Sequence, residues 1–313
     1  MAKSLIVGCN GQDGRYLCEF LQAKGVDVVG IDVRDESAPC PLVRADISDR
    51  DSVRCLLAEL QPAEIYYLAA FHQSAQGQSE DDLVIRSMEI NAISLDHFLV
   101  SVASLNLESR LFYAASSHLF GNCALTVQDE QTPYSPVCPY GISKATGAML
   151  CRYYRERGTY CSVGILYNHE SPRRPVDFVS RKIVNAAVNI RDGNQKSLIL
   201  GDLDAMVDWG YAPDYVAAMW AILQLDYGDD FVVASGARHS VREFVTIAFQ
   251  SVGMDWQKYV VEDRTLLAKA GPRRSLQGDS RKLKAATGWV PQTSFEQMVK
   301  NMVAAELAAR LTT

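Results

Sequence analysis

The chain has 313 residues, eight cysteines and a formal net charge of −6. Its length is sufficient for one large α/β unit or for two lobes that share a core. The acidic balance gives no support for nucleic-acid binding. The cysteines are scattered without a CxxC pair, which favours reduced core thiols in a cytoplasmic protein. We expect no signal peptide, and no apolar run approaches the ~20 residues of a membrane span.

Residues 5–7 form the first predicted strand, and a glycine-rich segment follows it. Gly8, Gly11 and Gly14 permit a tight turn, close approach of the backbone to a pyrophosphate, and close packing of the next helix. The helical pattern over residues 16–21 would place its N-terminus at the phosphates. We therefore assign dinucleotide binding to this segment, through Gly8, Asn10, Gly11, Gln12, Asp13 and Gly14.

A second apolar strand, residues 26–31, ends at Asp32. A carboxylate at this point binds the adenosine ribose of a dinucleotide and repels a 2′-phosphate, so NAD is the expected cofactor. Arg34 could pair with such a phosphate, which leaves NADP open. Both residues are counted among the cofactor contacts.

Strands and helices continue to alternate, as a doubly wound parallel sheet requires. We expect strands over 42–46, 64–70, 110–115 and 163–166, helices over 50–60 and 81–105, and a helix that starts at Pro139. Beyond residue 166 the regular alternation ends. The predicted fold class is α/β. A Rossmann domain would cover residues 1–167 and a smaller mixed α/β substrate lobe residues 168–313, with some interleaving of segments. Further cofactor contacts are expected at the ends of the third and fourth strands, from Asp46, Ile47, Leu68, Ala69 and Ala70.

Polar residues gather after the strand over 110–115, where ligands collect in open α/β sheets. Ser116 and His118 lie there, and Tyr140 and Lys144 follow four residues apart on one helix face. We expect the Lys144 ammonium to lower the pKa of the phenol, which could then take a proton from a substrate hydroxyl while a cofactor accepts hydride. These four residues are the predicted catalytic set, and Tyr140 and Lys144 are also counted among the cofactor contacts.

Several motifs spread over nearly the whole chain point to one family. They include Gly11-Gln12-Asp13-Gly14-Arg15-Tyr16-Leu17, Pro139-Tyr140-Gly141, Asn168-His169-Glu170-Ser171-Pro172-Arg173-Arg174 and Asp208-Trp209-Gly210. With these motifs the chain resembles the extended short-chain dehydrogenase/reductase superfamily, and within it most closely the GDP-mannose 4,6-dehydratases.

The resemblance implies a GDP-linked hexose that is oxidised at C4, loses water across C5 and C6, and regains hydride at C6, so that NAD(P) is regenerated. It also implies substrate contacts from Ser117, Asn168, Arg173, Arg181, Lys182, Val207 and Arg273. Val207 stands where the family carries an arginine for the diphosphate. Other cations, Arg174 and Arg274 among them, would then compensate.

His118 is the main departure, because the family pattern has a glutamate at this position. The imidazole could serve as the base for elimination, or elimination could be lost, leaving a nucleotide-sugar dehydrogenase, reductase or epimerase. A non-catalytic binding protein and a purely structural His118 are further alternatives. Residues 71–76 could shape the sugar pocket or form an ordinary polar loop.

Two further expectations concern assembly and metals. The family carries a longer, basic loop after the second strand that supports a tetramer, whereas this chain has a short connection there. We therefore expect a homodimer. His169 and Glu170 are adjacent on an extended segment and diverge, so no metal site is predicted.

Overall fold

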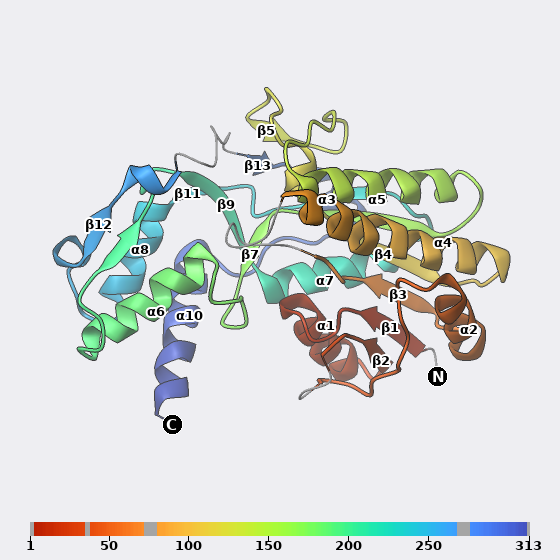
Figure 1. Ribbon diagram of the computed structural model, residues 1–313, viewed down its shortest axis with the longest axis horizontal. Coiled ribbons are helices and arrows are strands. Elements are labelled where there is room, and N and C mark those ends of the chain that lie inside the picture. The colour runs from red at the N-terminus through yellow and green to blue at the C-terminus, as the bar shows by residue number, and fades with distance from the viewer. Residues whose placement is uncertain (1–2, 35–37, 72–79, 268–275, 312–313) are drawn as a thin grey trace.

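The computed structural model describes residues 3–34, 38–71, 80–267 and 276–311 (Figure 1). Its centre is a sheet of six parallel strands in the order β10-β6-β4-β3-β1-β2. These strands are β1 (Lys3–Val7), β2 (Asp27–Ile31), β3 (Glu64–Tyr67), β4 (Arg110–Ser116), β6 (Cys161–Leu166) and β10 (Asp230–Val233). The strand order reverses between β1 and β3, as in a doubly wound fold. The predicted fold class is confirmed.

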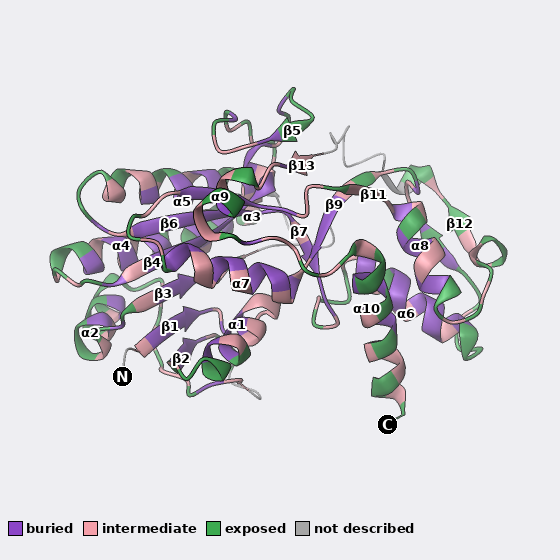
Figure 2. Cartoon of the chain, turned by 180° about the vertical axis from the view of Figure 1, so that it is seen from behind, coloured by how far each residue is buried: buried purple, intermediate pink, exposed green. Residues whose placement is uncertain are grey.

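Helices cover both faces of the sheet, which explains why its strands are buried almost throughout (Figure 2). Leu5 and Val7 point to one face, where they pack with α2 (Arg50–Leu60), α4 (Ser94–Ser104) and α5 (Pro139–Arg155). Ile6 points to the other face, toward α1 (Gln12–Ala23), α7 (Ala212–Leu223) and α9 (Arg281–Thr287). Both faces of the sheet are therefore core.

The other lobe has its own core between α6 (Val179–Arg191), α8 (Val241–Gln250) and α10 (Phe295–Arg310). Trp209 lies at its centre and packs against Phe244 and Phe295. A small sheet in the order β11-β9-β7 links the lobes; its strands are β7 (Asn168–Glu170), β9 (Met206–Tyr211) and β11 (Arg238–Ser240). Two short pairs complete the strands: β8 (Leu198–Leu200) with β12 (Val260–Glu262), and β5 (Val127–Gln128) with β13 (Gln277–Gly278).

The predicted strand over 42–46 is wrong, because this segment makes only a single bridge, between Gly30 and Leu42. Gly30 donates to the carbonyl of Pro41 and accepts from the N–H of Val43, each at 2.9 Å. Proline has no N–H to extend the ladder. Asp46 then accepts the N–H of Ser48 at 2.9 Å and turns the chain toward α2.

Two other elements differ in detail from the expectation. The helix expected over 81–105 consists of α3 (Glu80–Met88), a π-helix η1 (Glu89–Ile93) and α4. The strand expected over 64–70 ends at Tyr67. α7 and β10 follow residue 168 in the chain but pack with the N-terminal body, so the two lobes interleave. Within the described residues, no helix is both long and apolar enough to cross a membrane.

Candidate active site

The glycine-rich segment lies between β1 and α1 in a conformation that only small residues permit. Gly8 has a φ of +90°, and a Cβ there would lie 2.7 Å from the backbone nitrogen of Ala69. A Cβ on Gly14 would overlap the carbonyl oxygen of Gly8. The loop therefore presents bare backbone at the N-terminus of α1, which fits a dinucleotide pyrophosphate.

Asp32 follows β2 and is tied to this loop. Its Oδ2 accepts the N–H of Asn10 at 2.9 Å, and its Oδ1 accepts the N–H of Arg34 at 3.0 Å. The Arg34 guanidinium lies 3.5 Å from the same carboxylate, and 65% of its side chain is exposed. The position of the carboxylate at the end of β2 fits a hydrogen bond to the ribose of a dinucleotide, and a cation lies beside it.

The other expected cofactor residues lie along the same edge of the sheet. Leu68 donates its N–H to Val7 at 2.9 Å, and Ala69 lies against Gly8; Ala70, which follows, is exposed. The carbonyl of Ile47, next to Asp46, lies 3.0 Å from Nδ1 of His97. The ends of β1, β2 and β3 therefore surround the glycine-rich loop.

Gln12 and Asp13 behave differently from the expectation. Gln12 donates to the carbonyl of His169 at 3.1 Å and accepts from Ser171 at 2.7 Å. Asp13 Oδ2 lies 2.9 Å from Nε2 of His169, whose ring stacks on Tyr215. These side chains join α1 to β7, so contact with a dinucleotide would be through their backbone.

The Asp13–His169 contact is a partly buried pair of a carboxyl and an imidazole. Burial opposes the charge of Asp13, but His169, Gln12 and Arg174 together outweigh burial and lower the pKa of the carboxyl. Burial likewise opposes the charge of His169, and Asp13 outweighs it and raises the pKa of the imidazole. The contact therefore favours the charged form of each partner.

Ser116, Tyr140 and Lys144 lie together where β4 ends and α5 begins. Ser116 is hydrogen-bonded to Tyr140. Lys144 Nζ lies 5.7 Å from the centroid of the Tyr140 ring and donates to the carbonyl of Ala114 at 2.7 Å. Cys138 caps α5, and Pro139 occupies its first turn, as the sequence predicted for the helix start.

The electrostatics of Tyr140 contradict the sequence-based expectation. Burial raises the pKa of Tyr140 to about 12, and the charge of Arg174 and the hydrogen bond from Ser116 offset this only in part. Burial also lowers the pKa of Lys144 to about 7, so its own charge is disfavoured. The helical spacing was right, but Arg174 is the cation that lowers the pKa of the phenol in this structure.

Arg174 is thus a site residue that the sequence analysis did not assign to catalysis. Its Nε lies 3.3 Å from Glu170 Oε2, and its guanidinium lies over the ring of Phe178, 3.7 Å from the centroid. The signal available in the sequence was the second arginine of the Asn168–Arg174 motif.

Asn91 was also missed. It is fully buried in the π-helix, where it accepts the N–H of Phe71 at 2.8 Å and donates to Ser143 at 2.9 Å. It thereby ties the segment after β3 to α5. A buried polar residue inside a helical pattern was the only signal, and the partners lie far away in the chain.

His118 lies beside Tyr140, in the short 3-10 helix η2 (Ser117–Leu119). The two rings meet edge to face, with centroids 5.6 Å apart and planes at 82°. Nδ1 of His118 lies 3.8 Å from Sγ of Cys138. Ser117 is buried in the same turn. The imidazole therefore lies within the catalytic cluster.

The expected substrate cations have partners within the protein instead of a shared anion site. Arg173 binds Glu19 at 2.7 Å. Arg181 binds Glu306 at 3.1 Å, and Lys182 donates to the carbonyl of Ile199 at 3.1 Å. Val207 packs against the core of the C-terminal lobe. Asn168 opens β7, beside the Asp13–His169 pair.

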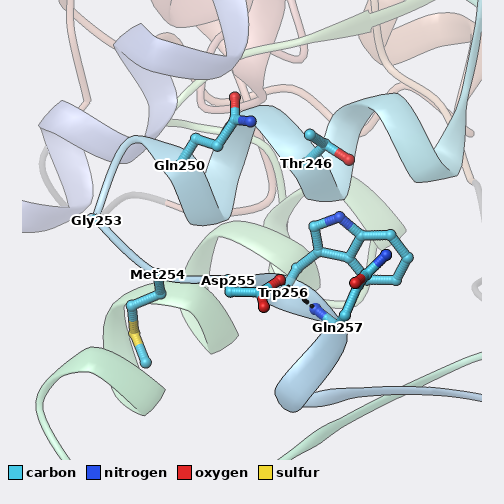
Figure 3. Close-up of a pocket in the computed structure, with 7 residues that line it drawn as sticks. All are labelled: Thr246, Gln250, Gly253, Met254, Asp255, Trp256 and Gln257. Carbon is cyan, nitrogen blue, oxygen red and sulfur yellow. Dashed lines mark hydrogen bonds between the residues drawn. The ribbon is translucent and has the colours of Figure 1, made fainter.

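Some expected residues lie outside the described part of the chain, namely Arg273, Arg274 and residues 72–76. A pocket of about 490 Å³ on the C-terminal lobe is separate from the catalytic cluster (Figure 3). It lies at the end of α8 and is lined by Thr246, Gln250, Gly253, Met254, Asp255, Trp256 and Gln257.

Known proteins resemble this chain over nearly its whole length. The family described as GDP-mannose 4,6 dehydratase matches residues 5–302. "GDP-mannose 4,6 dehydratase 2" of Arabidopsis thaliana is 38% identical, over 97% of this chain and 86% of the relative. "GDP-mannose 4,6-dehydratase" of Vibrio cholerae serotype O1 is 34% identical, over 97% and 93%.

A solved structure supports the fold. dTDP-glucose 4,6-dehydratase of Bacillus anthracis, in complex with NAD, superposes with a TM-score of 0.83 at 18% identity, over 99% of this chain and 98% of that one. The sequence relatives and the parallel sheet indicate the same family. The chain belongs to the GDP-mannose 4,6-dehydratase family of the extended short-chain dehydrogenase/reductase enzymes.

Proposed function

We propose that this protein is a cytoplasmic nucleotide-sugar 4,6-dehydratase that acts on a GDP-linked hexose with NAD as its cofactor. The observation that carries the proposal is the gathering of Ser116, His118 and Tyr140 at the strand ends beside the glycine-rich loop, in a chain of this family. Family membership supports the GDP-sugar.

Tyr140 acts as the base for the C4 hydroxyl. A bound NAD(P) supplies the acceptor for the C4 hydride and the donor that later returns it to C6. Tyr140 takes the hydroxyl proton, and Ser116, hydrogen-bonded to Tyr140, binds the same oxygen. The charge of Arg174 supports this role because it favours the phenolate.

His118 acts in the second half of the reaction. The new C4 carbonyl acidifies the hydrogen on C5, and the imidazole takes that proton as the C6 hydroxyl departs. The position of the ring beside Tyr140 supports this role, since C4 and C5 are adjacent carbons.

The test is incubation of the purified protein with GDP-, UDP-, CDP- and dTDP-hexoses in deuterated water, followed by mass spectrometry. A product that has lost one water and gained one solvent deuterium at C5 is expected. Loss of two hydrogens alone would overturn elimination in favour of C4 oxidation. Elimination that persists unchanged in His118→Ala would remove His118 from the mechanism, and His118→Glu tests the residue that the family pattern carries.

The preference for NAD rests on Asp32. A carboxylate at the end of β2 repels a 2′-phosphate. The Arg34 guanidinium, which could attract such a phosphate, lies 3.5 Å from the carboxylate of Asp32. Denaturation of the purified protein should release NAD, identified by mass spectrometry. Release of NADP would contradict the preference.

We also propose a homodimer formed through α5. Ile142, Met149 and Tyr153 share one face of this helix and are 44%, 54% and 50% exposed, and nearby Ile93 of the π-helix is 49% exposed. Exposed apolar patches of this kind are typical of protein–protein interfaces. Light scattering should give twice the chain mass, and Met149→Glu should give the monomer. A tetramer would overturn the expectation.

A further inference from the structure

His118 is held at its backbone from two sides. Its N–H donates to Ser116 Oγ at 3.3 Å. Its carbonyl lies under the first turn of α5, so that a Cβ on Gly141 would be only 2.5 Å from the His118 oxygen. Glycine at 141 therefore lets α5 begin directly on the turn that carries the imidazole.

This close approach brings Cys138 to His118. Cys138 is the N-cap of α5, and its Sγ accepts the N–H of Gly141 at 3.4 Å. The same sulfur lies 3.8 Å from Nδ1 of His118. Pro139 fixes the backbone just after the cap. The thiol thus lies between the helix N-terminus and the imidazole.

The hydrogen-bond partner of one imidazole nitrogen determines whether the other nitrogen can act as a base. A neutral imidazole carries one proton, and the nitrogen without it is the base. The hydrogen bond made by the second nitrogen selects between the two tautomers. A carboxylate has no such requirement, so a histidine in its place needs an orienting neighbour.

We propose that Cys138 is a positioning residue that accepts the Nδ1–H of His118 and so keeps Nε2 as the basic nitrogen. This inference rests on the proposed function. Sγ already accepts a hydrogen bond from Gly141 at the positive end of a helix, where electron density on sulfur is favoured. The opposite arrangement, with S–H donating to Nδ1, would leave a proton on Nε2 and prevent it from acting as a base.

His118 both takes and returns the proton that is moved during elimination. Nε2 takes the C5 proton, the C5–H electron pair forms the C5–C6 double bond, and the C6–O bond breaks. The departing oxygen takes the proton from Nε2 and leaves as water. The imidazole returns to its starting tautomer, and Cys138 neither gains nor loses a proton.

The tautomer can be read directly by nitrogen NMR of the full chain labelled with ¹⁵N-histidine. The five histidines are distinguished with His118→Gln. In the wild type, Nδ1 of His118 should carry the proton, and Cys138→Gly should move it toward Nε2. Glycine is a good N-cap, so this variant removes the sulfur with little effect on the start of α5. Cys138→Ser keeps an acceptor and should keep the tautomer. A proton on Nε2 in the wild type, or no change in Cys138→Gly, overturns the proposal.

Kinetics supply the second readout. Cys138→Gly should lower kcat for elimination about tenfold, the lower end of the losses seen when the orienting partner of a metal-bound histidine is removed. KM should change little, because Cys138 does not contact the substrate. Cys138→Ser should retain most of the wild-type kcat. Cys55→Ala, on the exposed side of α2, is the matched control and should match the wild type. An equal loss in the glycine and serine variants contradicts the proposal. If the wild type performs no elimination, the proposed function fails, and the NMR result still decides the tautomer.

Discussion

Replacement of Lys144 by methionine should stabilise the dinucleotide-free protein at neutral pH. Burial lowers the pKa of Lys144 from 10.5 to about 7, and about 1.4 kcal/mol per pH unit makes the cost of its charge about 5 kcal/mol below pH 7. At pH 7, where half the groups are neutral, the cost is about 4 kcal/mol. Loss of the hydrogen bond to the carbonyl of Ala114 costs about 1–2 kcal/mol. The net increase in the free energy of unfolding is therefore about 2–3 kcal/mol.

The sign of the pH dependence follows from the lowered pKa. The unfolded chain keeps the Lys144 proton up to about pH 10.5, whereas the folded chain releases it near 7, so the penalty fades as pH rises between these values. Urea unfolding at pH 6, 7.5 and 9 should show the advantage of Lys144→Met shrinking with pH. Lys182→Met, at an exposed site, is the control and should stay within about 0.5 kcal/mol of the wild type. An advantage of Lys144→Met that is absent or independent of pH would refute the desolvation argument.

Three other substitutions test the rest of the site. Gly14→Ala should abolish retention of the dinucleotide, because a Cβ there meets backbone atoms of Gly8; a purified variant that still carries NAD would contradict this. Asp13→Asn should destabilise the protein by about 3 kcal/mol. This loss of stability should be largest between about pH 4 and 6.5, where the lowered pKa of Asp13 and the raised pKa of His169 both contribute. It should shrink as the pH rises through the folded-state pKa of His169. An equal loss at pH 5 and pH 9 would contradict a charged Asp13–His169 pair. Tyr140→Phe should stop substrate-dependent absorbance at 340 nm from bound dinucleotide, and an unchanged signal would exclude the phenol as the base.

The N-terminal half of the fold was predictable because its signals are local. Strand β1, the glycine-rich loop and strand β2 follow one another within 31 residues, and each has a composition that few other structures use. The segment over 42–46 misled because a Val-Arg-Ala run fits a strand, whereas pairing was limited by Pro41 and by the turn at Asp46. Local pattern therefore predicts a strand only where nothing next to it stops the ladder.

The site was less predictable because its contacts join distant segments. Asp13 meets His169, and Arg181 meets Glu306, across more than a hundred residues. Asp13 was expected to contact the cofactor and Arg181 the substrate, but the partner of each depends on how the lobes pack. A charged residue in a motif is thus a weak guide to which charge it faces.

The expectation that Lys144 lowers the pKa of Tyr140 failed for a similar reason, because it was made from local spacing alone. Helical spacing correctly places the ammonium beside the phenol, but spacing contains no information about burial, and burial acts on both groups. It raises the pKa of Tyr140 to about 12 and lowers that of Lys144 to about 7, so the charge that favours the phenolate comes from Arg174 of another segment. Arg174 lies 34 residues from Tyr140 in the sequence. Because its charge lowers the pKa of the phenol, Arg174→Gln should raise that pKa further and shift the alkaline onset of C4 oxidation to higher pH. An unshifted onset would contradict the assignment of this charge to Arg174.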